Sequence, residues 1–481
     1  MTIPHSQLSP DRLFPIDPQH RALSRNLYEE IKGLPIISPH GHTDPAWFAL
    51  DQPFANPAAL LITPDHYLLR LLYSQGLALE SFGREPLDNQ PFEQRGRQSR
   101  HECDPRTIWR LFAKHFYLFR GTPSALWMAQ VLSEVFSVPE GLNADSADQI
   151  YDQVHAALGR PDFRPRSLFK KFNIEVLCTT DGPTDPLQHH QQIRQSGWPA
   201  RIIPCFRPDP VLDPEHEHFQ QELNRLSELT GEDTLSFAGY LLALRNRRDF
   251  FRSLGATSTD HGHPTAATLE ATPLDAEKLF HRAISGTASP SEAEKFRAMM
   301  LFEMARMSLD DGLVMQLHPG ACRNHNQFLY QRFGRDVGGD IPTPTEYVRA
   351  LKPMLDRFGN EKNFRLILFT LDESVYAREL APLAGLYPAV KLGPPWWFHD
   401  SPEGMKRFRE QVTETAGIYN TVGFNDDTRA FCSIPARHDM ARRMDCVMLA
   451  KWVLEHRLRE DEALEMAHDL TYRLAKESYR L

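Results

Sequence analysis

Eight short β-rich runs, separated by stretches long enough for helices, constrain the fold of this chain more than any other feature. They span residues 34–37, 174–180, 201–206, 256–259, 312–317, 364–370, 389–393 and 419–424. Strands that alternate with helical segments are typical of parallel βαβ units, and eight such units predict an α/β fold, a closed (β/α)₈ TIM barrel. A doubly wound open sheet is the rival, but no glycine-rich phosphate-binding loop follows the first run.

A long helical block separates the first two β-rich runs. Within it, Thr122 followed by Pro123 is typical of an N-cap and a first-turn proline. We therefore predict one structural domain in three parts. They are an N-terminal segment with the first strand (1–45), a helical insertion after that strand (46–170), and the remainder of the barrel with C-terminal helices (171–481).

Charge and cysteine usage argue against several classes of protein. The net charge of −9, without a long basic stripe, argues against a nucleic-acid partner. No apolar run approaches the roughly 18 residues that a membrane span needs, and the first residues lack the pattern of a secretory signal. The six cysteines are scattered without a Cys-x-x-Cys pair, which is typical of reduced thiols. We therefore expect a cytoplasmic protein that binds neither nucleic acid nor membrane.

Two histidines directly follow the first β-rich run. Since side chains alternate along a strand, His40 and His42 project to the same face, and two imidazoles at a strand end can chelate one metal ion. Such an ion needs a further, preferably anionic, ligand. Asp427 follows the last run, and the first and last strands of a closed barrel are neighbours. We predict His40, His42 and Asp427 as metal ligands, with Asp426 as the rival of Asp427.

Polar residues also end the middle strands, where barrel enzymes place their active sites. His318 could be a fourth ligand or a substrate contact. A second His-Gly-His, at 261–263, competes with the first on pattern alone. However, Asp260-His261-Gly262 is typical of a turn, in which strand periodicity does not hold. We therefore expect His261 to line the pocket without binding metal.

Nine segments, in order along nearly the whole chain, form a more specific pattern. They are Pro-His-Gly-His at 39–42, Asp-His-Tyr at 65–67, Cys-Thr-Thr-Asp at 178–181, Cys-Phe-Arg-Pro-Asp at 205–209, Thr-Asp-His-Gly at 259–262, Leu-His-Pro-Gly-Ala-Cys-Arg-Asn at 317–324, Gly-Pro-Pro-Trp-Trp-Phe at 393–398, Asp-Thr-Arg at 427–429 and Arg-His-Asp at 437–439. In these segments the chain resembles the uronate isomerase (glucuronate isomerase) family of the amidohydrolase superfamily. Where relatives have Asp-Ser-Arg, this chain has Thr428, which keeps the hydroxyl.

The resemblance implies a metal-dependent-hydrolase-like barrel with a hexuronate substrate. It would interconvert D-glucuronate with D-fructuronate and D-galacturonate with D-tagaturonate in hexuronate catabolism, by proton transfer through a cis-enediol. Hydrolytic members of the superfamily carry a lysine at the fourth strand end and a histidine at the sixth, where this chain has Asp372. The departure favours one divalent ion over two, and zinc is the expected metal.

The resemblance also implies roles for individual residues. Asp427 is the expected base, because a carboxylate beside a metal can abstract a proton once water is excluded. Tyr67 would pass the proton between the two substrate oxygens, and His66 would orient Tyr67. This role requires the helical insertion to fold over the barrel mouth as a cover, which would also keep water from the enediol.

Arginine and tryptophan side chains complete the predicted substrate site. A uronate carboxylate is best held by the fork of an arginine, and three candidates lie at or just beyond strand ends: Arg207, Arg429 and Arg437. The sequence does not choose among them. Trp396 and Trp397 could present ring faces to the sugar, although one of them could equally be an aromatic plug beneath the loop.

Two alternatives stay open on the residues alone. A mononuclear metal-dependent hydrolase or deaminase would use the same His-x-His and aspartate to activate water. A barrel without catalytic activity would bind a sugar acid and release it unchanged. We also expect a homo-oligomer, although no association surface can be identified from the sequence.

Overall fold

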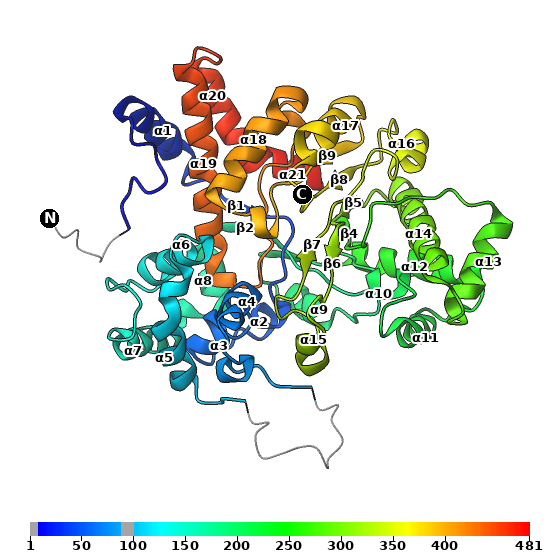
Figure 1. The fold of residues 1–481 in the computed structure, drawn as a ribbon, viewed down its shortest axis with the longest axis horizontal. Coiled ribbons are helices and arrows are strands. Elements are labelled where there is room, and N and C mark those ends of the chain that lie inside the picture. Colours follow the sequence, from blue (N-terminus) through cyan, green and yellow to red (C-terminus); the bar gives the residue numbers. More distant parts are fainter. Residues whose placement is uncertain (1–7, 88–100) are drawn as a thin grey trace.

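The structure is a computed structural model and describes residues 8–87 and 101–481. Parallel strands lie inside, and helices surround them (Figure 1). Helix α1 (Pro18–Ile31) begins after Asp17, whose carboxylate accepts the His20 N–H and caps the helix. It packs against α19 (Ile434–Leu454), so helices from the two ends of the chain lie side by side.

Seven of the eight expected runs contain strands, all parallel to their neighbours. The first ladder comprises β1 (Ile36–Ser38), β2 (Ile174–Cys178) and β3 (Arg201–Ile203), and the second comprises β4 (Ser258–His261), β5 (Val314–Leu317), β8 (Leu366–Leu368) and β9 (Val390–Leu392). Phe206 joins the two ladders, because its backbone pairs with Thr259 of β4. The carboxyl ends of these strands therefore meet on one side of the framework.

The eighth run, 419–424, forms no ladder in the described part of the chain. It begins with a 3₁₀ turn, η8 (Ile418–Asn420), and pairs with β9 at Thr421. Gly423 has a φ of 76° and Asp427 a φ of 40°, and residues in the left-handed region cannot continue an extended strand.

Single hydrogen bonds then link this segment to the first strand. The Asp427 N–H donates to the His40 carbonyl at 3.3 Å, and the His42 N–H donates to the Thr428 carbonyl at 3.0 Å. The last run therefore lies between β9 and β1, which is the strand order of a barrel. We refer to these two bonds as the seam.

The described residues of the segment between β1 and β2 form helices joined by loops, with no strand among them. It contains α2 (Pro45–Leu50), α3 (Pro57–Leu61), α4 (His66–Ser74), α5 (Pro105–His115), α6 (Pro123–Gln130), α7 (Ala147–Leu158) and α8 (Pro165–Lys171), with short 3₁₀ and π turns between them. Four of these helices begin with proline after an N-cap side chain that accepts a backbone N–H: Asp44, Asn56, Asp104 and Thr122. Trp109, Phe112 and Ile150 are fully buried in an apolar core that the segment forms largely by itself.

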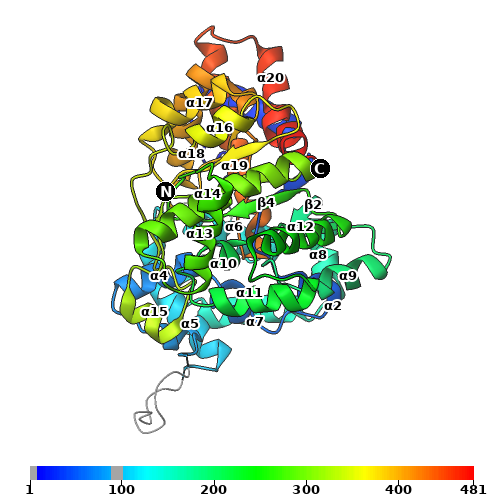
Figure 2. The ribbon, with the colours of Figure 1, turned by 90° about the vertical axis from the view of Figure 1, so that its right-hand side faces the viewer.

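The remaining helices cover the outside of the strands. They are α9 (Gln188–Gln195), α10 (Asp209–Leu212), α11 (Phe219–Thr230), α12 (Phe237–Ser253), α13 (Pro273–Ile284), α14 (Pro290–Asp311), α16 (Lys352–Phe358), α17 (Ala381–Leu386), α18 (Pro402–Ala416), α20 (Glu460–His468) and α21 (Leu474–Tyr479). Figure 2 shows α11 to α14 together on one flank. Leu244, Phe302 and Met315 are buried where this flank packs on the strands.

An excursion after β5 was not expected from the sequence. It forms a short antiparallel hairpin, β6 (Ala321–Cys322) with β7 (Ile341–Pro342), and between these strands it carries α15 (Gln327–Phe333). Among the described residues, no helix combines the length and the apolar character that crossing a bilayer requires.

Candidate active site

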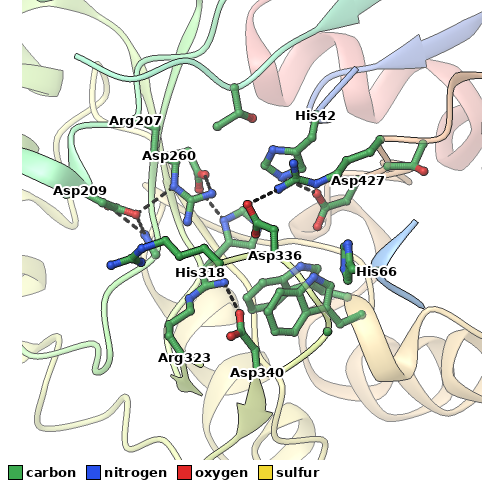
Figure 3. Close-up of a pocket in the computed structure, with 18 of the residues that line it drawn as sticks. His42, His66, Arg207, Asp209, Asp260, His318, Arg323, Asp336, Asp340 and Asp427 are labelled. Atoms are coloured by element: carbon green, nitrogen blue, oxygen red, sulfur yellow. Dashed lines mark hydrogen bonds and ion pairs between the residues drawn. The ribbon is translucent and has the colours of Figure 1, made fainter. Parts of the chain in front are cut away.

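A cavity of about 390 Å³ lies at the carboxyl ends of the strands. It is bounded by strand ends, by α4 of the insertion, by the hairpin excursion and by the start of α19 (Figure 3). Of the residues predicted for the site, those that line the cavity are His40, His42, His66, Tyr67, Arg207, His318, Trp396, Trp397, Asp427, Arg429 and Arg437. The structure therefore brings together side chains from distant parts of the chain.

His40, His42 and Asp427 form a group that could hold a metal ion. One carboxylate oxygen of Asp427 lies 3.3 Å from His40 Nε2 and 3.1 Å from His42 Nε2. The rival Asp426 is engaged elsewhere, because its carboxylate lies 3.0 Å from His438 Nε2 in the buried interior. Asp427 has left-handed backbone geometry, which is uncommon for a residue with a side chain and is frequent at functional sites.

The charges in this group favour a cation. Burial disfavours charge on each side chain, yet the carboxylates of Asp427 and Asp260 raise the pKa of His40 well above its ordinary value. Burial alone would raise the pKa of Asp427. The imidazoles of His40 and His42 outweigh burial and hold this pKa well below its usual range. Two imidazoles and one carboxylate are also an ordinary donor set for a divalent transition metal. The residues present therefore fit the expected ion.

His318 contributes to a second, overlapping group with His40 and Asp260. His318 Nδ1 lies 2.6 Å from the Asp260 carboxylate, and the His318 ring stacks on His40 and on Phe369, with centroids 4.8 and 3.8 Å apart. His318 Nε2 is buried and has no hydrogen-bond partner. The position suits either of the expected roles, a fourth ligand or a substrate contact.

The Asp-His-Tyr segment forms the start of α4. Asp65 caps the helix by accepting the backbone N–H groups of Tyr67 (2.9 Å) and Leu68 (3.4 Å), which turns His66 and Tyr67 toward the cavity. The His66 and Tyr67 rings stack at 4.7 Å. Burial, followed by the field of Arg429, lowers the pKa of His66 to about 3, so this imidazole is neutral at pH 7.

The three predicted arginines differ in how deeply they are buried and in which carboxylates of the protein they pair with. Arg207 pairs with two carboxylates, Asp209 at 2.9 Å and Asp260 at 3.0 Å. Arg437 is buried, pairs with Asp400 at 2.9 Å, and lies over the Trp127 ring at 3.6 Å.

Arg429 is the least enclosed of the three. It pairs with Asp336 at 3.0 Å, and the side chains of the two are 37 % and 55 % exposed. Asp336 belongs to the hairpin excursion and lines the cavity, near the middle of the side chains labelled in Figure 3.

The two tryptophans meet the cavity differently. Trp396 is 6 % exposed. Its ring lies edge-on to His318, with the two ring centroids 4.8 Å apart. Trp397 has a φ of 50°, and its ring faces the guanidinium of Arg323 at 5.2 Å.

The structure corrects the expectation for His261. β4 continues through His261, so strand alternation holds there, with Asp260 lining the cavity and His261 outside its lining. The His261 ring is fully buried, and its Nε2 lies 3.1 Å from Thr259 Oγ1. The segment is therefore not the turn that its residues suggested.

Several lining residues were missed as site candidates. Asp260 and Arg323 stand within motif segments, so the sequence carried a signal for them. Asp336 and Asp340 carry no comparable signal. They reach the cavity because the excursion folds back over it, where Asp340 pairs with Arg323 at 2.8 Å.

A parallel α/β framework that brings His-x-His and an opposing aspartate together at its strand ends is a fold like that of the metal-dependent hydrolases. A solved structure from Lactobacillus casei ATCC 334, named after the metal-dependent hydrolases, shares this fold at 13% identity and a TM-score of 0.51, over 94% of this chain and 97% of that one. A model of the glucuronate isomerase family matches residues 19–479. The chain belongs to the glucuronate isomerase family.

Individual relatives support the assignment over the full length. The uronate isomerase of Xanthomonas campestris pv. campestris (strain 8004) is 60% identical over 474 residues, covering 98% of this chain and 99% of that protein. The crystal structure of glucuronate isomerase from Caulobacter crescentus superposes with a TM-score of 0.95 at 56% identity, over 98% of this chain and 97% of that one. The predicted fold class, family and enzyme class are thereby confirmed: the protein is an aldose–ketose isomerase of the uronate isomerase kind.

Proposed function

We propose that the protein isomerises D-glucuronate to D-fructuronate and D-galacturonate to D-tagaturonate, by moving a proton between C2 and C1 through a cis-enediol. The observation that carries the mechanism is the position of Asp427, whose carboxylate contacts His40 and His42 and faces the same cavity as Tyr67 and Arg429. One cavity thus offers a base, a hydroxyl and a carboxylate-binding cation, and an aldose–ketose isomerisation of a uronate requires all three.

We further propose that His40, His42 and Asp427 hold one divalent metal ion, zinc. When bound, the ion would polarise a substrate oxygen and stabilise negative charge on the enediolate. Asp427 is the base that removes the C2 proton. Its lowered pKa keeps the carboxylate ionised at neutral pH, which is the state that a base requires, and its position in the cavity brings it to the substrate.

Tyr67 moves the second proton, between the oxygens on C1 and C2. Its phenol is buried, which raises the Tyr67 pKa well above its ordinary value and keeps the proton on the hydroxyl before reaction. His66 orients Tyr67 through their stacked rings. Residues 46–170 act as a cover, because α4 places both side chains over the strand ends and excludes water from the enediol.

Arg429 is the arginine that we assign to the substrate carboxylate. Arg207 and Arg437 are already paired with largely buried carboxylates, whereas the partner of Arg429 is the half-exposed Asp336. A uronate carboxylate can therefore replace Asp336 on Arg429 without leaving a buried charge unpaired. The sugar then contacts Arg207, His318, Trp396 and Trp397. Arg437 acts on the substrate indirectly, through Tyr67.

Two further properties belong to the proposal. We place the protein in the cytoplasm, and the support is that all six cysteines are free in the structure, Cys103 and Cys322 among them at the surface. We also propose a homo-oligomer, to be measured by light scattering coupled to size-exclusion chromatography.

The decisive experiment incubates the zinc-loaded enzyme with D-glucuronate, and separately with D-galacturonate, in deuterated water while NMR spectra are recorded. The expected result is a ketose product with deuterium incorporated from solvent and no released ammonia. Substrate returned without exchange would contradict the isomerase mechanism. Ammonia or a cleavage product would instead support the rival hydrolase or deaminase.

A further inference from the structure

A third group of metal-ligating side chains lies beside Arg207 and shares no residue with the two groups that contain His40. It comprises Asp209, at the start of α10, with His261 and His263, which stand at and just after the end of β4. One ligand atom from each of the three residues lies within 4.8 Å of the others, and His263 Nε2 is 3.8 Å from an Asp209 oxygen. Figure 3 shows Asp209 on the side of Arg207 away from Asp427.

The two histidines have ring nitrogens that the protein leaves without partners. His263 is 4 % exposed, and neither of its ring nitrogens makes a hydrogen bond. His261 is fully buried, and its Nδ1 is also unpartnered, while Nε2 faces Thr259. Buried polar atoms without partners cost free energy and are rare in folded proteins, so three of them beside one carboxylate require an explanation.

Both imidazoles are buried, and burial favours the neutral ring, whose free lone pair is what binds a metal. Thr259 Oγ1 can accept the His261 Nε2–H, which would leave the lone pair on Nδ1.

The surrounding charge also favours a cation. Asp213, Glu215 and Glu294 all contact Arg297 near His263, and Asp209 and Asp260 both contact Arg207. Five carboxylates thus contact the guanidinium groups of Arg207 and Arg297, and Arg323, which also lies beside Gly262, is itself paired with Asp340, so carboxylates outnumber guanidinium groups around the unpartnered nitrogens.

We propose that Asp209, His261 and His263 form a second divalent-metal site of the zinc class, with water completing the coordination. Four-coordinate zinc with bonds of about 2.0 Å separates its ligand atoms by about 3.3 Å, so small side-chain rotations close the present geometry. The ion ties the start of α10 to the end of β4. It therefore fixes Asp209, and through Asp209 the Arg207 guanidinium that faces the cavity.

The test counts zinc per chain in the full-length protein, after stripping with a chelator, reloading with zinc chloride and removing excess ion. Elemental analysis should give two equivalents in the unmodified protein and one in His263→Gln or His40→Asn. His216→Gln is the matched control, because His216 lines the same cavity outside both groups, and it should keep two equivalents. One equivalent in the unmodified protein, or two in His263→Gln, would overturn the proposal.

Cobalt gives a readout that does not depend on activity or on the catalytic group. Titration of His40→Asn with Co²⁺ should develop visible absorption that saturates at one equivalent. His40→Asn combined with His263→Gln should develop none, while circular dichroism shows that it is folded. Absence of the band from His40→Asn, or its persistence in the double variant, would also overturn the second site.

Discussion

At the scale of single residues, Asp427 carries the greatest chemical demand. Its carboxylate contacts both imidazoles and also faces the substrate cavity, and its backbone lies in the left-handed region. Because the proposed ligand and base roles meet in one side chain, a substitution of Asp427 requires two measurements, metal content and turnover.

We expect Asp427→Asn to lower kcat by about 10²–10⁴-fold, the usual contribution of a general base, while the fold is kept. Steady-state kinetics with elemental analysis and a thermal melt check this. Asp372→Asn is the control, because Asp372 also follows a strand but lies outside the cavity lining, so its kcat should stay unchanged. Activity of Asp427→Asn close to that of the unmodified enzyme would remove it from the role of base.

Asp336 gives a second residue-scale prediction. Asp336→Asn should lower KM for D-glucuronate several-fold with little change in kcat, since it removes the charge that competes for Arg429. Asparagine tolerates the positive φ of 63° at this position, so the loop geometry is preserved.

Asp340→Asn serves as the comparison, because it unpairs Arg323 instead of Arg429. Arg429→Met should raise KM at least tenfold. If Asp336→Asn raised KM, or if Arg429→Met left it unchanged, the carboxylate would have to be assigned to another arginine.

What the sequence predicted at this scale depended on strand alternation. Strand alternation correctly placed His40 and His42 at one cavity, because the two residues follow a strand and stand two positions apart. The prediction failed at His261, where strand β4 extends two residues beyond the expected run 256–259 and the charged Asp260 occupies the inward position. Hydrophobic patterns do not show strands whose inward side chains are charged, and such strands occur at functional sites.

At the scale of elements, α19 joins the insertion to the barrel. From this helix, Arg437 lies over Trp127 of α6 and pairs with Asp400, directly after η7 (Trp397–His399). All three side chains are largely buried, so the arrangement fixes the cover at the site where Tyr67 packs against the Trp127 ring.

We expect Arg437→Met to lower the free energy of unfolding by about 3 kcal/mol, because it leaves the Asp400 carboxylate buried without its partner. Adding Asp400→Asn should recover part of the loss. Urea denaturation measures both. Arg407→Met is the matched control: Arg407 pairs with Glu373 at the surface, and its loss should cost less than about 1 kcal/mol. Equal effects of the two arginine variants would contradict a clamping role.

The elements themselves were predictable where apolar runs alternate with helices, but two features were not. The β6–β7 excursion with α15 has no periodic signal, since each strand has only two residues and, apart from Ala321, these are exposed or half-buried. The last run carries a good strand pattern, yet Gly423 and Asp427 interrupt it through their positive φ values. Positive φ at a non-glycine residue is set by tertiary contacts, which local propensity does not contain.

At the scale of the whole molecule, buried acids make stability depend on pH. Burial raises the pKa of Asp181 to about 7 against an ordinary value near 3.8. Between these two values the folded state holds a proton that the unfolded chain has lost, so this contribution to stability is complete at low pH and disappears as pH rises toward 7. The buried His190 acts oppositely: burial lowers its pKa to about 4, so its contribution to stability grows as pH rises from 4 to 6.5.

Asp181→Asn separates these opposing contributions. Relative to the unmodified protein, its free energy of unfolding should rise as pH is increased from 4 to 7, by up to about 4 kcal/mol. Urea denaturation at several pH values checks the slope. A difference between the two proteins that does not vary with pH would show that Asp181 is already ionised at pH 4.

The seam has a consequence for how the barrel stays closed. Its two hydrogen bonds join His40 and His42 to Asp427 and Thr428, the segments that supply the proposed zinc ligands, and no ladder reinforces them in the described part of the chain. An ion held by all three ligands would therefore cross-link the first strand to the last. The chain between these strands would then stay joined at its ends when the seam opens, which lowers the entropy of the open form. Amide hydrogen exchange at His42 and Asp427 should accordingly slow when zinc is added, more than at the β4–β5 ladder, and the proposed ion would then hold the barrel closed as well as serve the reaction.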